Sequence, residues 1–191
     1  NSGVKLNSGI VLQNNLLLTQ GIFDINSNLL TLSQNSNLIG TPGLSKMIVS
    51  DGVVSSPGVR KFFTAAPQSF TFPVGVSGKY TPAQFIISAN ATVGYVGVSP
   101  INEYHPSVSD SMIVLNYYWK IESAGMSGFT GDVLFQYLPS DVSGVESNYV
   151  AARLVLPGNT WTKALPGPAT DNVDEINHRI YFNYSISNNL N

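Results

Sequence analysis

The sequence contains no cysteine, and this absence excludes several kinds of protein at once. Zinc sites with thiolate ligands, iron–sulfur clusters, cysteine nucleophiles and disulfide scaffolds all require that residue. A chain of 191 residues buries about 70% of the surface that its unfolded form exposes, so we expect a hydrophobic core alone to stabilise the fold. The lack of cysteine does not indicate the cellular compartment, because many secreted bacterial proteins also have no disulfides.

Charged residues are scarce as well. They make up 10% of the chain, the formal net charge is −2, and the nine Lys and Arg residues are scattered singly. Binding to nucleic acid needs a cationic stripe or patch, so we exclude nucleic acid as a partner. No apolar run reaches the ~20 residues of a membrane span. The N-terminus lacks the basic and then apolar layout of a signal peptide, so we expect the sequence to begin within a mature protein.

The first 55 residues are rich in Asn, Ser, Leu and Gly, whereas nearly all Tyr, Trp and Pro residues follow later. Apolar residues alternate with other residues between polar turns, as at Ile10 and Leu12, and a period of two predicts strands. A shift of fourteen residues lays residues 16–20 over residues 30–34. We interpret residues 1–55 as stacked β-helix or solenoid-like strand repeats, with an antiparallel meander as the alternative.

The remaining chain, residues 56–191, contains longer alternating segments. Residues 112–122 alternate throughout, and one face is apolar: Ile113, Leu115, Tyr117, Trp119 and Ile121. The same alternation occurs in four further segments: 70–74, 133–137, 150–156 and 180–186. No window has the 3.6-residue period of a helix. We therefore predict an all-β chain, in which the solenoid-like segment precedes an antiparallel β-sandwich or forms one continuous unit with it.

Five motifs follow one another in a distinctive order: MIVSDG at 47–52, GVRKFF at 58–63, SFTFPVGVSGKYTPA at 69–83, LNYYWKI at 115–121 and SGFTGDVLFQY at 127–137. This order resembles a module of large, repeat-rich secreted and cell-surface proteins of the Bacteroidetes, many of them exported by the type IX route. The resemblance spans about residues 10–165. It implies an extracellular or cell-surface location in a Gram-negative bacterium. Tyr117 stands where the module has an arginine.

The FPVGVSGKYTP segment has a physical interpretation of its own. Pro73 lacks a backbone N–H, so we expect the strand that contains Phe70 and Phe72 to end there or to lie on a sheet edge. Gly75 and Gly78 provide backbone freedom for a tight connection. We expect Lys79 to point to solvent before the next strand begins.

Residues suited to catalysis are few. The two histidines, His105 and His178, lie far apart in the chain, and neither a G-x-S-x-G nor an H-E-x-x-H motif is present. We therefore expect no enzyme and no catalytic residues. Three neighbouring residues, Asp171, Asn172 and Asp174, offer the oxygen ligands that Ca²⁺ prefers, although the loop lacks the EF-hand pattern and a solvated turn is the alternative. We expect no other cofactor.

Aromatic side chains on exposed faces are the candidates for ligand binding. Tyr118 and Tyr181 lie opposite the apolar rows of their segments, and Trp161 follows a Pro-Gly-Asn turn. These three residues predict contact with a carbohydrate, whereas aromatic pairing that only stabilises a sheet is the alternative. Asp110-Ser111-Met112 fits the Asp-Ser/Thr-apolar pattern of O-glycosylation sites in exported Bacteroidetes proteins.

Composition and resemblance together predict a non-enzymatic structural or adhesive module of a larger secreted or cell-surface bacterial protein. Its expected partners are neighbouring domains of the parent protein and surface glycans. The alternative is a carbohydrate-binding module that accompanies a polysaccharide-active enzyme; coplanar aromatic rings on one exposed face would favour it. A hydrolase is a third possibility, and it would need a cleft in which two carboxylates or a Ser-His pair meet.

Overall fold

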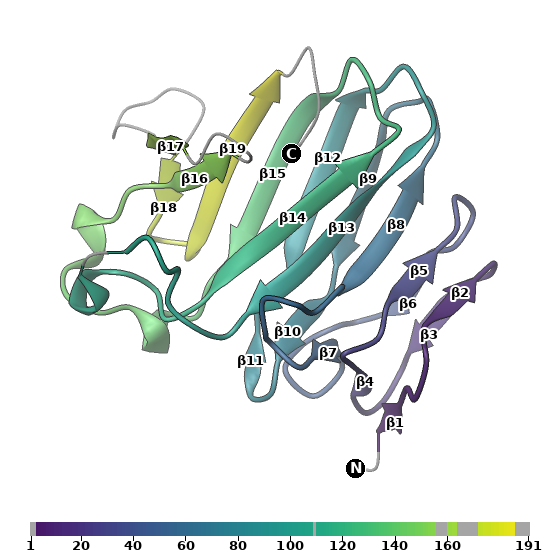
Figure 1. Ribbon diagram of the computed structural model, residues 1–191, viewed down its shortest axis with the longest axis horizontal. Helices are drawn as coiled ribbons and strands as arrows, with labels where there is room; N and C mark the ends of the chain where they lie inside the picture. The colour runs from purple at the N-terminus through teal and green to yellow at the C-terminus, as the bar shows by residue number, and fades with distance from the viewer. Residues whose placement is uncertain (1–2, 109, 156–159, 164–171, 186–191) are drawn as a thin grey trace.

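The computed structural model of the chain describes residues 3–108, 110–155, 160–163 and 172–185. Within these residues the chain forms strands, turns and three short 3-10 helices, with no α-helix, which confirms the predicted all-β class. Short stacked strands lie at the N-terminal end, and long strands form two layers over the rest of the molecule (Figure 1).

The N-terminal strands form stacked coils. The first coil contains β1 (Val4–Lys5), β2 (Ile10–Leu12) and β3 (Leu16–Leu18); the second contains β4 (Phe23–Asn26), β5 (Leu30–Leu32) and β6 (Leu38–Gly40); a third begins with β7 (Ile48–Ser50) and β8 (Val59–Phe63). Strands at the same place in successive coils pair in parallel: β1 with β4, β4 with β7, β2 with β5, β5 with β8, and β3 with β6. This arrangement of about three turns confirms the predicted solenoid-like repeat.

The repeat length inferred from the sequence is wrong. Ile10 pairs with Leu30, so the first coil takes about twenty residues. The second coil is longer, because Phe23 pairs with Ile48 and Leu30 pairs with Val59. The fourteen-residue shift instead matches β3 with β5, which belong to different sheets. Strands on different sides of the coil turn leucines inward, as β3 does with Leu18 and β5 with Leu30 and Leu32, so a match of leucines does not identify equivalent sides.

Three five-stranded sheets organise the described strands (Figure 1). The lower sheet has the order β1-β4-β7-β10-β11, with β10 (Val74–Val76) and β11 (Lys79–Tyr80). The front sheet has the order β14-β13-β8-β5-β2, with β14 (Tyr118–Ala124) and β13 (Gly94–Ile101). The back sheet has the order β18-β19-β15-β12-β9; its strands are β18 (Asn172–Asp174), β19 (Arg179–Ser185), β15 (Thr130–Gln136), β12 (Ala83–Ala89) and β9 (Gln68–Phe72). A separate hairpin joins β16 (Ala152–Val155) to β17 (Thr160–Lys163).

The front and back sheets enclose the hydrophobic core. Phe63 of β8 contacts Phe70 of β9 with ring centroids 6.3 Å apart, and Trp119 of β14 contacts Phe135 of β15 at 4.9 Å. The same core cluster includes Leu30 of the second coil, which is fully buried. β8 pairs in parallel with β5 and antiparallel with β13, so the front sheet continues across residue 55. Solenoid-like coils and sandwich therefore share one sheet and one core.

The predicted strand over residues 112–122 is shorter in the structure. Its first part forms the 3-10 helix η1 (Ser111–Ile113), in which the Asp110 side chain accepts a hydrogen bond from the backbone N–H of Met112. Ile113 is 59% exposed rather than buried. From Tyr117 onward the prediction is correct: Tyr117 is buried, and Trp119 packs against the core. A local side-chain bond overrides the alternating pattern at the start of the segment.

The strand break at Pro73 is confirmed. β9 ends at Phe72 in the back sheet, and β10 begins at Val74 in the lower sheet. Gly78 has a φ of 79° in the turn between β10 and β11. The prediction for Lys79 is wrong, because its ammonium donates to Asn116 Oδ1 at 2.7 Å and its side chain is only 19% exposed.

Candidate functional site

Tyr118 and Trp161, two of the three aromatic residues singled out in the sequence, both pack against His105. The His105 ring is 4.9 Å from the ring of Tyr118 and 5.0 Å from that of Trp161, centroid to centroid. Trp161 lies on β17 and is 36% exposed. The interplanar angles, 67° and 77°, describe edge-to-face packing. The group is therefore a small aromatic cluster in which His105 is not coplanar with either neighbour.

His105 is a neutral member of this cluster. Its Nδ1 accepts a hydrogen bond from the backbone N–H of Ser107 at 3.1 Å, so the ring proton sits on Nε2. Burial lowers the pKa of His105 below its ordinary value. The side chain thus packs as an uncharged aromatic ring against Tyr118 and Trp161.

The third predicted aromatic residue, Tyr181, belongs to another part of the fold. It lies on β19 of the back sheet and pairs with Asn172 of β18. Together with Asp174 and Arg179 it lines an open surface hollow of about 710 Å³. The structure therefore places Tyr181 on a different sheet from Tyr118.

The structure describes two of the three predicted calcium ligands, Asn172 and Asp174. Asp171 lies outside the described residues, and Asn172 is the first residue of β18. Asp174 closes the turn that follows: Asn177 donates its backbone N–H to one carboxylate oxygen at 3.1 Å and its Nδ2 to the other at 2.7 Å. The side-chain bond from Asn177 is the main reason why the pKa of Asp174 is lowered. In the part of the chain that the structure describes, no three His, Cys, Asp or Glu residues gather to hold a metal ion.

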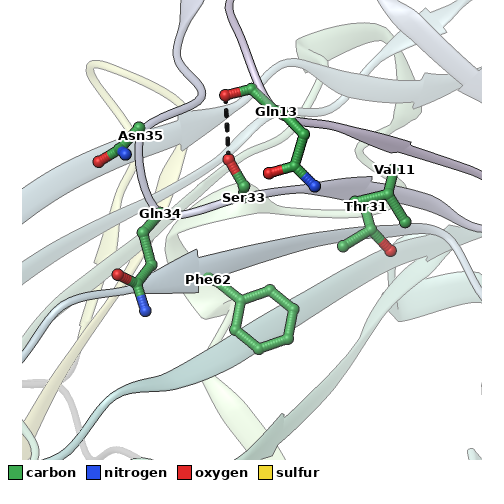
Figure 2. Close-up of a pocket in the computed structure, with 7 residues that line it drawn as sticks. All are labelled: Val11, Gln13, Thr31, Ser33, Gln34, Asn35 and Phe62. Atoms are coloured by element: carbon green, nitrogen blue, oxygen red, sulfur yellow. Dashed lines mark hydrogen bonds between the residues drawn. The ribbon is translucent and has the colours of Figure 1, made fainter.

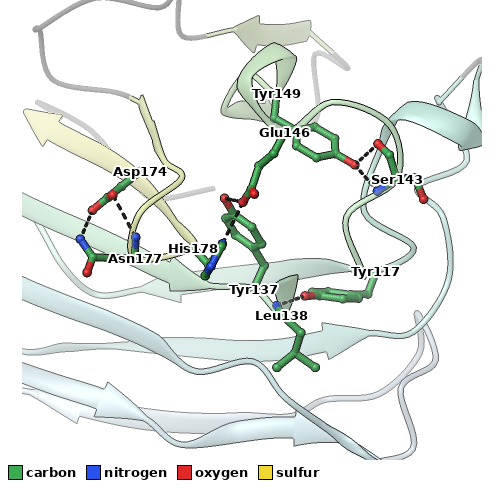
Figure 3. Close-up of polar contacts among 9 residues, drawn as sticks. All are labelled: Tyr117, Tyr137, Leu138, Ser143, Glu146, Tyr149, Asp174, Asn177 and His178. Carbon is green, nitrogen blue, oxygen red and sulfur yellow. Dashed lines mark hydrogen bonds and ion pairs between the residues drawn. The ribbon is translucent and has the colours of Figure 1, made fainter. Parts of the chain in front are cut away.

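A polar cluster that sequence reasoning missed joins Tyr137, Glu146 and His178 (Figure 3). Glu146 Oε1 accepts from the Tyr137 hydroxyl at 2.6 Å and lies 2.9 Å from His178 Nδ1. These bonds, that from Tyr137 first, lower the pKa of Glu146, whereas burial raises the pKa of Tyr137. The three residues come from separate segments, so no sequence spacing could have indicated the cluster.

Two further tyrosines near this cluster, Tyr117 and Tyr149, bind backbone groups of the loop between β15 and β16. The Tyr117 hydroxyl accepts from the backbone N–H of Leu138 at 3.0 Å. The Tyr149 hydroxyl donates to the carbonyl of Ser143 at 2.8 Å and accepts from the N–H of the same residue at 2.9 Å (Figure 3). The loop carries the 3-10 helices η2 (Pro139–Asp141) and η3 (Glu146–Asn148). Tyrosine hydroxyls thus satisfy loop backbone groups that regular pairing leaves free.

A hollow of about 330 Å³ lies on the outer face of the front sheet (Figure 2). Amides of Gln13, Gln34 and Asn35, hydroxyls of Thr31 and Ser33, and the ring of Phe62 line it. The hollow forms because β2 and β5 end at Leu12 and Leu32, whereas β8 continues to Phe63. Phe62 lies beyond the last paired residue of β5, and the loops after the two shorter strands supply the polar residues around it.

Sequence reasoning gave no role to this hollow, although GVRKFF contained a signal. In β8 the buried residues are Val59, Lys61 and Phe63, so Arg60 and Phe62 face outward. The period of two therefore marked Phe62 as an aromatic side chain on the outer face. The loops that complete the hollow come from two successive coils, and their approach depends on the stacking.

The fold and these sites define the class of the protein: an all-β chain in which solenoid-like coils continue into a sandwich. Comparison with protein families, with curated proteins and with solved structures found no match to this chain. Among the described residues, no helix has the length and apolar character needed to cross a membrane.

Proposed function

We propose that this chain is a non-enzymatic structural and adhesive module of a larger secreted or cell-surface bacterial protein. The observation that carries the proposal is the stacking of the N-terminal coils. Within the described chain, β1, β2 and β3 pair on one side only, with β4, β5 and β6. The outer edges of a first coil are templates for further parallel pairing. These edges support the expected partners, which are neighbouring domains of the parent protein, with surface glycans beside them.

Side chains that link successive coils support this role. Asn28 Nδ2 donates to the carbonyl of Leu6 at 3.1 Å, and Asn15 Oδ1 accepts from the N–H of Asn37 at 3.0 Å. Each bond spans one coil boundary, so the Asn-rich composition serves coil stacking. An extended stack of this kind presents an adhesive surface at a distance from the cell without needing catalytic groups.

The polar groups of the Tyr137 cluster are also consistent with a structural role. Glu146 contacts Tyr137 and His178, and the tyrosine hydroxyls nearby bind backbone groups of one loop. These interactions hold a long connection against the sandwich. The packing of Tyr118 and Trp161 against His105 favours the carbohydrate-binding alternative, although the His105 ring meets both neighbours edge to face and so does not form one flat platform with them.

The proposal is tested in the source cells with the full-length protein. A tag beside the module should be labelled by antibody on intact cells and removed by added protease. In-frame deletion of the whole module should reduce attachment to host or partner cells while the rest of the protein still reaches the surface. A tag protected in intact cells, or unchanged attachment after the deletion, would contradict the proposal.

A further inference from the structure

We infer that the hollow beside Phe62 is a binding site for one ring of a neutral sugar. The inference stands independently of the proposed scaffold role, because it rests on the chemistry of the hollow alone. An aromatic ring offers a face for the C–H groups of a pyranose, and side-chain amides offer hydrogen bonds for its hydroxyls. The hollow supplies both kinds of group within a volume of about 330 Å³, at the lower limit of small-ligand sites.

Phe62 is the aromatic surface that remains available here. It is half-buried on β8 and contacts Tyr95 of β13, with ring centroids 5.5 Å apart and an interplanar angle of 60°. The guanidinium of Arg60 lies 4.0 Å from the centroid of the Tyr95 ring. The same guanidinium binds Glu122 Oε1 at 2.7 Å, which holds it in place. Tyr95 therefore supports Phe62 from the side while its own face is occupied, which limits the site to one stacked ring.

The polar rim of the hollow has unused hydrogen-bonding capacity. Gln13, Gln34 and Asn35 are exposed, and their side-chain amides have no hydrogen-bond partner among the described residues. Figure 2 shows Gln13 and Gln34 extending from the two loops toward the side of the sheet that carries Phe62. An amide offers a donor and an acceptor, as a sugar hydroxyl does. No residue that lines the hollow is ionisable, which favours an uncharged ligand.

The rim is fixed before any ligand arrives. Lys61 Nζ donates to the carbonyls of Ser33 and Gln34 at 2.7 and 2.8 Å. Because Lys61 is buried on the inner face of β8, it holds the loop after β5 from the side opposite the hollow. Ser36 Oγ donates to the carbonyl of Leu12 at 2.6 Å, and Ser33 Oγ donates to that of Gln13 at 3.3 Å. These bonds tie the loops of two coils together. A fixed site loses less conformational entropy on binding than a mobile loop.

The test is an NMR titration of the ¹⁵N-labelled chain. The probes are methyl glycosides of glucose, galactose and mannose, N-acetylglucosamine, and hexasaccharides of β-glucan, xylan and mannan. We expect at least one probe to bind in the millimolar range, with shifts of the Gln13 and Gln34 side-chain amides. Phe62→Ala should weaken this binding at least about tenfold, because the stacking surface is lost. Gln34→Ala should weaken it by a smaller factor.

Trp161→Ala is the matched control, since it removes an exposed aromatic side chain from the His105 cluster and leaves the hollow intact. It should leave the affinity unchanged. An amide spectrum that keeps the wild-type dispersion would show that a variant is folded. We expect this for Phe62→Ala, because Phe62 is only half-buried. Absence of binding by every probe, binding that survives Phe62→Ala, or binding that Trp161→Ala abolishes would each overturn the inference.

Discussion

Lys61 is a buried lysine at the junction between coils and sandwich. Its side chain extends inward from β8, the residue is 2% exposed, and its Nζ lies 5.6 Å from the centroid of the Phe70 ring. Burial lowers its pKa from 10.5 to about 8. A neutral amine still has two N–H groups, so both bonds to the carbonyls of Ser33 and Gln34 survive deprotonation. Because the folded chain releases this proton at a lower pH than the unfolded chain, the free energy of unfolding depends on pH in the alkaline range.

We predict that the free energy of unfolding rises with pH between about 8 and 10.5 because of Lys61. In that window the unfolded chain holds a proton that the folded chain has lost, so a higher pH favours the folded state. The gain over the whole window is at most about 3 kcal/mol. Urea unfolding of the wild type and of Lys61→Met across this range measures it. If the difference between the two proteins does not change with pH, the lysine is not buried as described.

Other residues of the molecule show why single positions resist prediction. Lys79 follows a turn signal, and a lysine there is usually solvated, yet Asn116 and Asp141 approach it from distant parts of the chain. Glu146 lies in a polar loop, where nothing in the sequence indicates that Tyr137 and His178 would meet it. Such contacts depend on which loops the sheets bring together.

At the scale of elements, the coil strands show a clear division between inner and outer residues. Leu30 of β5 is fully buried between its neighbours, whereas Leu17 of β3 is 60% exposed. Their local sequences look alike, since both lie in short leucine-rich strands. The exposed position faces outward because its strand turns the two flanking leucines, Leu16 and Leu18, toward the coil interior.

This difference predicts the outcome of two alanine substitutions. Leu30→Ala should lower the free energy of unfolding by about 2–5 kcal/mol, because it leaves a cavity in the core. Leu17→Ala is the matched control and should change it by no more than about 0.5 kcal/mol. Denaturant titration of the two variants provides both values. Equal losses would mean that the coils do not stack with the described inner face.

The element boundaries follow local chemistry more closely than alternation. Pro73 ends β9 as its missing N–H predicts. The alternating pattern predicted a strand from residue 112, whereas β14 begins at Tyr118. The Asp110 side chain accepts a hydrogen bond from the N–H of Met112 and so begins a 3-10 helix there instead. An alternating pattern shows which residues share a face only where the backbone is extended, and a short polar side chain can prevent that extension.

At the scale of the whole molecule, coils and sandwich are joined by β8. In the front sheet this strand is the last of the parallel strands β2, β5 and β8 and the antiparallel neighbour of β13. Leu30 of the coils belongs to the same core cluster as Phe85 and Val133 of the back sheet. A boundary placed near residue 55 by composition therefore crosses a continuous sheet and a continuous core.

We predict that the described coils and sandwich unfold in one transition. Thermal unfolding followed by far-UV circular dichroism should coincide with that followed by Trp119 fluorescence in a Trp161→Phe background, because Trp119 packs on the shared core. Leu30→Ala should move both curves together, by roughly 2–4 °C for each kcal/mol lost. A coil transition that precedes the Trp119 signal would show two independent units.

The sequence by itself determined the all-β class, the solenoid-like N-terminal coils, the strand end at Pro73 and much of the core face of β14. These features depend on side-chain alternation and on backbone chemistry, which act over a few residues. Only the tertiary structure decided the coil length, the sharing of one sheet by coils and sandwich, and the groups around His105, Glu146 and Phe62. Each of these depends on contacts between segments far apart in the chain, and local patterns do not specify which segments meet.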